Sequence, residues 1–146
     1  MNNLKYLTGV LPLLLAMSLF SQSSMADIVI VVNKDSPLTS LSSKEAKRIF
    51  LGVTKKLPNG KSIKIADLGD DDAVMEEFYM TVTNKSVSEI KSRWAGLAFS
   101  GKAVPPARLN SQNDVKIWLK GNNSGIGYID SKRVDDSLRV VYTLPK

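Results

Sequence analysis

The stretch Asp27-Ile28-Val29-Ile30-Val31-Val32-Asn33 decides the fold class of this chain. Its five central residues are all apolar and β-branched, and no polar residue alternates with them. A strand with one face in water would alternate, so this run predicts a strand that is covered on both faces. Strands of that kind belong to layered α/β domains, in which helices pack on the two faces of a sheet.

Helix signals follow this strand at four places. Capping boxes at Ser42–Glu45 and Ser86–Glu89 predict two helix starts, because the serine accepts from the first turn and the glutamate reaches back to the cap. The acidic run Gly69–Asp72 predicts a third, since carboxylates cap free N–H groups and oppose the helix dipole. The polar run Asn110–Asp114 predicts a fourth helix, which Gly121 can end.

Three more strands are predicted, at residues 62–66, 126–129 and 138–142. The element order is then β-α-β-α-α-α-β-β, which predicts a sheet that is parallel at least in part. Gly52 is predicted to end the first helix, and a loop is predicted at 100–106. The helical spacing predicts these core positions: Ala46, Ile49, Phe50, Val53, Val74, Phe78, Val82, Ile90, Trp94, Leu97, Ala98, Val115, Trp118 and Leu119.

The first 26 residues have the three-part pattern of a secretory signal peptide. Lys5 and the amino terminus are positive, Val10–Phe20 is apolar, and Ser24-Met25-Ala26 offers small residues for cleavage after Ala26. The apolar run is shorter than the roughly 20 residues of a membrane-spanning helix. We therefore predict cleavage, export to the periplasm, no membrane span afterwards, and one domain over residues 27–146; an uncleaved anchor or a buried helix is the alternative.

The composition excludes several kinds of chemistry. The 146 residues include no histidine and no cysteine. Disulfides and thiol nucleophiles therefore have no residues to build them, and hydrolase triads and zinc enzymes lack their usual base and ligands. The chain has 20 basic and 14 acidic residues, but the basic ones are scattered, so a nucleic-acid partner is not indicated. Nothing in the sequence indicates a cofactor, and no residue set indicates an enzyme.

Candidate ligand contacts lie in loops after two strands, at residues 33–42 and 67–72. The second loop precedes a helix, whose N-terminus attracts anions. Gly69, Asp70, Asp71 and Asp72 are candidates there, although three carboxylates would repel an anion that brings neither a proton nor a cation.

Two other interpretations of the acidic loop remain open. The aspartates can be ordinary helix caps. Alternatively, they can form a divalent-cation site with Asp67, although their spacing is not that of an EF-hand. Lys102 and Arg108 flank Pro105-Pro106, where they are either oxyanion ligands or ordinary surface charges.

Several segments together resemble the phosphate-binding components of ABC transporters, a branch of the type 2 periplasmic solute-binding proteins, and in particular their short single-domain relatives. The segments are Ile30-Val31-Val32-Asn33, Ser36-Pro37, Leu41-Ser42, Arg48-Ile49-Phe50-Leu51-Gly52, Phe78-Tyr79, Lys85-Ser86, Trp94-Ala95-Gly96-Leu97, Phe99-Ser100-Gly101-Lys102, Pro105-Pro106 and Gly125-Ile126-Gly127-Tyr128-Ile129-Asp130. The resemblance implies an α/β fold, a three-layer periplasmic-binding-protein-like lobe with a mixed, partly parallel sheet.

The resemblance also implies a function, which is non-enzymatic binding of phosphate or a related oxyanion for an ABC transporter or an envelope sensor. It places the binding loop at Gly69–Asp72, with Ser36 and Thr39 as lesser candidates. Two features differ from the family. The family's loop is of the Ser-Gly-Thr type, and 120 residues supply only about one of its two lobes. The alternative is therefore a ligand-free protein-interaction module on the same scaffold; a permease or a sensor protein is the expected partner.

Overall fold

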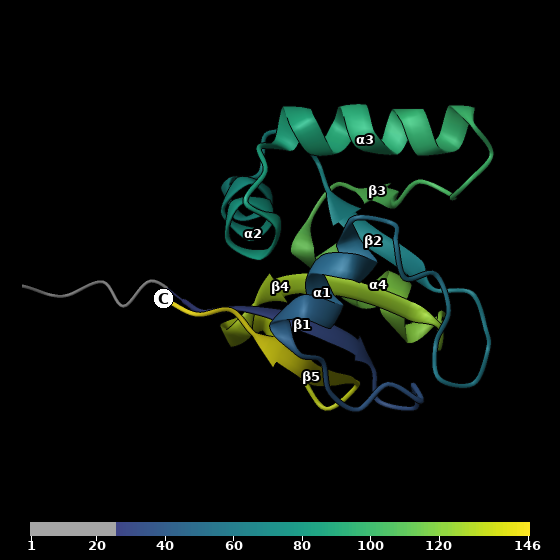
Figure 1. The fold of residues 1–146 in the computed structure, drawn as a ribbon. Helices are drawn as coiled ribbons and strands as arrows, with labels where there is room; N and C mark the ends of the chain where they lie inside the picture. The colour runs from purple at the N-terminus through teal and green to yellow at the C-terminus, as the bar shows by residue number, and fades with distance from the viewer. Residues whose placement is uncertain (1–25) are drawn as a thin grey trace, which may run out of the picture.

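A computed structural model describes residues 26–146, so the predicted signal segment lies outside the described residues apart from Ala26. Its five strands form one mixed sheet in the order β3-β2-β4-β1-β5 (Figure 1). The strands are β1 (Ile28–Asn33), β2 (Lys64–Leu68), β3 (Ala107–Leu109), β4 (Gly125–Asp130) and β5 (Leu138–Thr143). The α-helices are α1 (Ser43–Phe50), α2 (Ala73–Thr83), α3 (Val87–Phe99) and α4 (Gln112–Lys120).

Strand direction divides the loops between two ends of the sheet. Strand β2 is parallel to β3 and β4, whereas β1 is antiparallel to β4 and β5. The carboxyl ends of β2, β3 and β4 therefore lie together, at what we call the Asp67 end. The carboxyl end of β1 lies at the opposite end, which we call the Asn33 end.

Helices cover both faces of the sheet, as the sequence predicted. Helices α1 and α2 lie on one face and α4 lies on the other (Figure 1). All six residues of β1 are buried between these layers. Close packing of α4 depends on Gly125 and Gly127, because a Cβ at Gly125 would lie 2.7 Å from the Trp118 ring and one at Gly127 would lie 3.0 Å from Val115. The predicted three-layer α/β architecture with a partly parallel sheet is confirmed.

The core between the sheet and helices α1 and α2 is an aromatic cluster. It contains Phe50, Phe78, Tyr79 and Tyr128, all of them fully buried. The rings of Phe78 and Tyr128 stack with their centroids 3.8 Å apart, and Phe50 meets Phe78 edge to face at 4.7 Å. Such pairs add to the free energy gained from apolar burial. The cluster fixes α1 and α2 against β4.

Both predicted capping boxes are present, and Asp72 is the N-cap of α2 as the acidic run predicted. Two sequence predictions need correction. No strand was predicted at residues 107–109, where the structure has β3, because three residues carry no periodicity of their own. The predicted faces of the helices also shift: Val53 and Ala98 are exposed, while Val74, Val82, Leu97 and Trp118 are only partly buried. Helix α2 packs against α1, α3 and the sheet at once, so its buried face is wider than one stripe and includes Met75, Tyr79 and Thr83.

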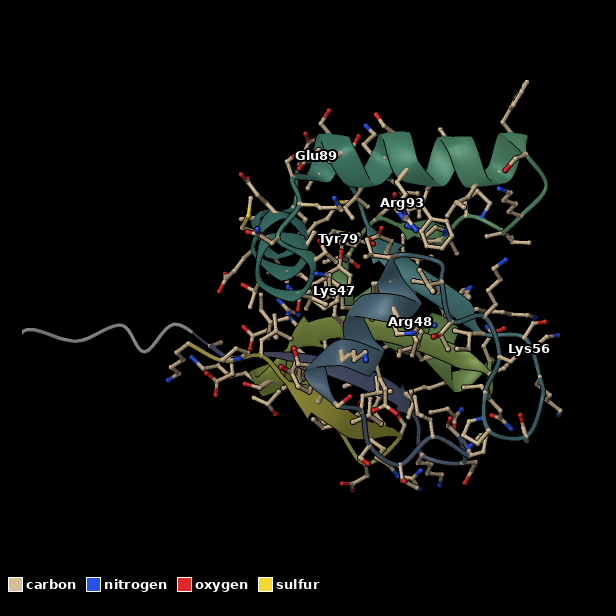
Figure 2. The ribbon with its side chains drawn as sticks, viewed as in Figure 1. Lys47, Arg48, Lys56, Tyr79, Glu89 and Arg93 are labelled. Carbon is tan, nitrogen blue, oxygen red and sulfur yellow. The ribbon has the colours of Figure 1, made fainter. Side chains whose placement is uncertain are left out.

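Helix α3 packs closely against the end of α1 at Gly52. Gly52 has a φ of 71°, as expected of a residue that follows a helix. Its α-carbon faces α3, since a Cβ there would lie 2.9 Å from both Trp94 and Leu97. Arg93 points from α3 toward α1 (Figure 2) and donates from Nε to the Leu51 carbonyl at 2.7 Å. Gly52 therefore permits the close approach of the two helices.

Replacing Gly52 by alanine is expected to destabilise the fold more than the same change at Gly60. Both residues have positive φ, but a Cβ at Gly60 meets nothing within 4 Å. Gly60→Ala therefore measures backbone strain alone, and Gly52→Ala adds overpacking, for an extra loss of about 1–3 kcal/mol. Thermal or urea denaturation of the two variants gives this difference, and equal losses would contradict the packing described for Gly52.

None of the helices within residues 26–146 is long and apolar enough to cross a membrane.

Candidate functional site

A group of ionisable side chains lies at the Asp67 end of the sheet, where β2 passes into α2. The connecting residues 69–72 form a turn in which the Asp72 N–H donates to the Gly69 carbonyl at 3.1 Å. The Asp72 side chain then accepts from the Val74 N–H at 2.9 Å and starts α2. The chain thus places three successive aspartates beside the first turn of α2.

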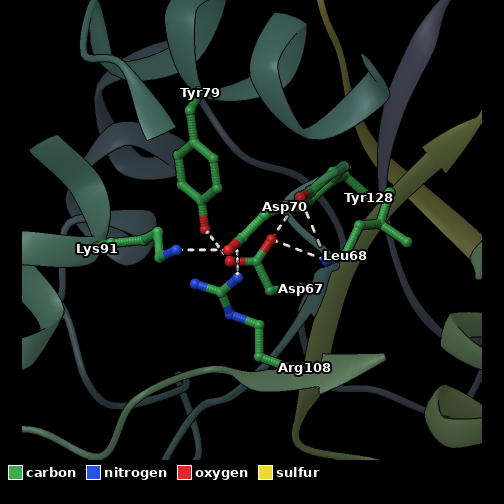
Figure 3. Close-up of polar contacts among 7 residues, drawn as sticks. All are labelled: Asp67, Leu68, Asp70, Tyr79, Lys91, Arg108 and Tyr128. Carbon is green, nitrogen blue, oxygen red and sulfur yellow. Dashed lines mark hydrogen bonds and ion pairs between the residues drawn. The ribbon is translucent and has the colours of Figure 1, made fainter. Parts of the chain in front are cut away.

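Asp67, in strand β2, is the buried residue of the site, with 1% of its surface exposed. One carboxylate oxygen accepts from the Leu68 N–H at 2.9 Å and from the Tyr128 hydroxyl, while the other accepts from the Tyr79 hydroxyl at 2.7 Å (Figure 3). The Tyr128 oxygen in turn accepts from the Leu68 N–H at 3.4 Å. Strand β2, strand β4 and helix α2 are therefore joined through one buried carboxylate.

Burial raises the pKa of Asp67 above its ordinary value of 3.8, against the opposing effects of its hydrogen bonds to Tyr128, Tyr79 and Leu68 and of the charge on Arg108. Burial also raises the pKa of both tyrosine hydroxyls, and the Asp67 charge raises it further. The tyrosines therefore remain protonated donors. They stabilise the carboxylate without neutralising it.

Asp70 lies nearer the surface than Asp67, and its carboxylate is bound by two cations. Lys91 of α3 and Arg108 of β3 each contact a different oxygen of its carboxylate (Figure 3). Their hydrogen bonds hold the pKa of Asp70 below its ordinary value. Arg108 is placed here because it stands opposite Asp67 in the parallel β2–β3 pairing. The side chains of Asp70, Lys91 and Arg108 are each about half exposed, so water reaches these ion pairs.

The structure brings together some of the residues that the sequence suggested as ligands and separates others. Gly69, Asp70, Asp71, Asp72 and Arg108 lie at the Asp67 end, where Asp71 is exposed.

The other candidates lie elsewhere. Ser36 is buried at the Asn33 end, where its hydroxyl accepts from the Leu38 N–H at 3.2 Å, and Thr39 is exposed in the same loop. Because β1 runs antiparallel to its neighbours, this loop lies at the far end of the sheet. Lys102 lines a separate cleft with Trp94.

The cation-site interpretation receives no support from the geometry. Among residues 26–146 there is no group of three or more acidic side chains placed to hold a metal ion. Of the four aspartates considered, Asp67 is bonded to two tyrosines, Asp70 lies between two cations, and Asp72 caps α2. Most of the carboxylate oxygens that a hard cation would need are therefore already engaged.

Sequence reasoning did not identify three residues of this site: Lys91, Tyr79 and Tyr128. The two tyrosines stand within segments that carry the family resemblance, but the hydroxyl contacts to Asp67 join positions 12 and 61 residues apart. Lys91 lies on the exposed side of α3 and looks like an ordinary surface residue in the sequence.

Comparisons with known proteins support the fold. No family model matches the chain, and no curated protein matches it. Solved structures do match, and each of three covers 80% of this chain. An ABC-type phosphate transport receptor from Vibrio cholerae has a TM-score of 0.63, 18% identity and 45% of its own length covered. A protein described as a phosphate ABC transporter substrate-binding protein, with bound phosphate, from Clostridium perfringens has values of 0.66, 21% and 44%. PstS from Borrelia burgdorferi has values of 0.63, 12% and 46%.

These likenesses confirm the family resemblance at the level of the fold. The chain spans less than half the length of the proteins that it matches.

Proposed function

We propose that this chain is an exported, non-enzymatic solute-binding domain that binds phosphate or a related small oxyanion at the Asp67 end. One observation carries the proposal. The carboxylate of Asp70 is bound there by Arg108 and Lys91, so the site already holds a planar pair of anionic oxygens supplied by the chain itself. An external oxyanion with the same charge can replace that carboxylate when the Gly69–Asp72 turn moves.

In this proposal Arg108 and Lys91 bind the anionic oxygens of the ligand, and Asp70 accepts a hydrogen bond from the ligand's proton-bearing hydroxyl. Arg108 presents several N–H donors in a fixed plane, which suits a tetrahedral oxyanion, and Lys91 adds a second positive charge. The displaced aspartate accepts a hydrogen bond from a ligand that carries a proton. Phosphate at neutral pH carries such a proton and sulfate does not, so phosphate is the preferred ligand. The fold likeness to phosphate receptors is consistent with this choice.

Replacing Arg108 by glutamine is expected to weaken phosphate binding by about tenfold or more, because hydrogen bonds to charged groups contribute about 1.5–3 kcal/mol. Calorimetric titration of the purified protein with phosphate, sulfate and acetate measures the effect. Arg133→Gln is the matched control, since Arg133 is exposed in the short helix that follows β4 and makes no contact in this site. Equal affinities for the two variants would exclude Arg108 as a ligand, and no saturable heat with phosphate would reject phosphate binding by this chain alone.

A protein partner completes the proposed function. Two of the solved structures named above, those from Vibrio cholerae and Clostridium perfringens, belong to ABC transport systems by their descriptions, and this chain spans less than half of each. We propose that a transporter permease or an envelope sensor protein receives the loaded domain.

A ligand-free interaction module is the second candidate, and one observation favours it. Phe99, at the end of α3, has 98% of its surface exposed, and Met80 on α2 is 48% exposed. Aromatic side chains are enriched at protein interfaces, so an exposed Phe99 is suited to contact a partner. Cross-linking in envelope extracts of the native chain and of Phe99→Ser separates the candidates. A partner that depends on Phe99, together with absent phosphate binding, would favour the interaction module.

A further inference from the structure

A second cleft lies away from the Asp67 end, beside the amino ends of β2 and β3. Its volume is about 550 Å³, which is within the range of small-molecule sites. The walls come from the end of α1, residues 54–65, the second half of α3 and the loop 101–105. The lining includes neither Asp70 nor Arg108, so the cleft is separate from the proposed oxyanion site.

The inner surface of the cleft is apolar. Trp94, Ile49, Ile63 and Ile65 contribute to it, and Val104 stands at the opening with 87% of its surface exposed. Trp94 is 6% exposed, and its Nε1 has no hydrogen-bond partner among the described residues. The indole ring contributes apolar surface to the wall of the cleft.

The cleft is also strongly positive. Lys55, Lys56 and Lys102 line it, and none of the lining residues is acidic. Lys56, shown beside the α1–β2 connection in Figure 2, donates to the Ser62 hydroxyl at 3.1 Å. Lys55 donates to the Lys102 carbonyl and so links the two walls. The acidic residue Glu45 lines a neighbouring hollow that shares Lys56 and Ile63 with the cleft, and its carboxylate accepts from the Ser42 N–H at 2.7 Å.

We propose that this cleft binds a small amphiphilic carboxylate. Its alkyl or aromatic body lies against Trp94, Ile63 and Ile65, and its carboxylate lies toward the three lysines. Three ammonium groups on one cleft repel one another, and a single carboxylate relieves that repulsion. The apolar inner surface favours a ligand that also carries a hydrophobic body, because inorganic phosphate cannot bury such a surface. This site does not depend on oxyanion binding at the Asp67 end.

Tryptophan fluorescence tests the proposal directly, because the chain has only two tryptophans. In a Trp118→Phe background, Trp94 is the sole reporter. Decanoate and 4-phenylbutyrate are the probes, one for an alkyl body and one for an aromatic body. Acetate and phosphate supply charge without a hydrophobic body, and decanol supplies the body without charge. We expect a saturable change in emission with at least one of the two probes, and much weaker responses with the three controls.

Three variants locate the site. Lys102→Gln is expected to raise the probe's Kd by about fivefold, as for one partly exposed ion pair, and Val104→Asp is expected to abolish binding by placing a carboxylate at the opening. Lys132→Gln, which removes an exposed lysine elsewhere, should leave the Kd unchanged. Because Lys102 and Val104 are exposed, these changes leave the core intact. No saturable response to either probe, equal responses to acetate, or equal Kd values for Lys102→Gln and Lys132→Gln would overturn the proposal.

Discussion

Asp67→Ala is expected to lower the free energy of unfolding by about 3 kcal/mol. The change removes the acceptor for the Tyr79 and Tyr128 hydroxyls and for the Leu68 N–H, all of which are buried. A buried donor left without an acceptor costs about 1–3 kcal/mol, so even partial rearrangement leaves a large loss. Urea denaturation at neutral pH measures it.

Asp67→Asn is the matched control, because it keeps one carbonyl acceptor and the size of the side chain. We expect a smaller loss than for alanine. The two chains should also differ in pH dependence. The raised pKa means that the folded protein binds this proton more tightly than the unfolded chain does. The part of the stability that depends on protonation of Asp67 is therefore fully present below a pH of about 3.8 and is lost as the pH rises through the raised pKa. The hydrogen bonds that Asp67 accepts contribute separately at neutral pH, and asparagine shows no such pH dependence. A loss with alanine no larger than with asparagine would contradict the network described here.

Phe78→Ala is expected to destabilise the protein by about 3–5 kcal/mol, the usual loss for an aromatic residue in a closed core. Phe78 is fully buried, stacks on Tyr128 and meets Phe50 edge to face. Its loss would leave a cavity that the rigid faces of α1 and β4 can fill only in part. Chemical denaturation is again the measurement.

Met80 on the same helix provides the control for this change. It is 48% exposed, so Met80→Ala should change the stability little. A loss for Phe78→Ala below about 1 kcal/mol, or one no greater than that for Met80→Ala, would show that the aromatic cluster does not hold α2 against the sheet.

Local signals in the sequence were sufficient for most of the fold. The β-branched run at 28–32 predicted a fully covered strand, and both capping boxes start helices where they were expected. These features depend on neighbouring residues only. Strand β3 was missed because its three residues are ordered by pairing with β2 rather than by a pattern of their own.

The candidate site was harder to predict, because it depends on strand direction. The loops at 33–42 and 67–72 look equivalent in the sequence, since each follows a strand. They lie at opposite ends because β1 is antiparallel to its neighbours. The same reason explains Arg108 and Lys102: β3 carries Arg108 to Asp70, while Lys102, before that strand, lines the cleft.

The central claim is that the Asp67 end, with Arg108 and the Gly69–Asp72 turn, is where a small oxyanion binds. Mapping of backbone amide shifts by NMR during a phosphate titration of the purified protein tests it most directly. We expect saturable shifts that are largest in residues 69–74 and at Lys91 and Arg108. Shifts confined to Lys55, Lys102 and their neighbours, or no saturable shift at all, would contradict the claim.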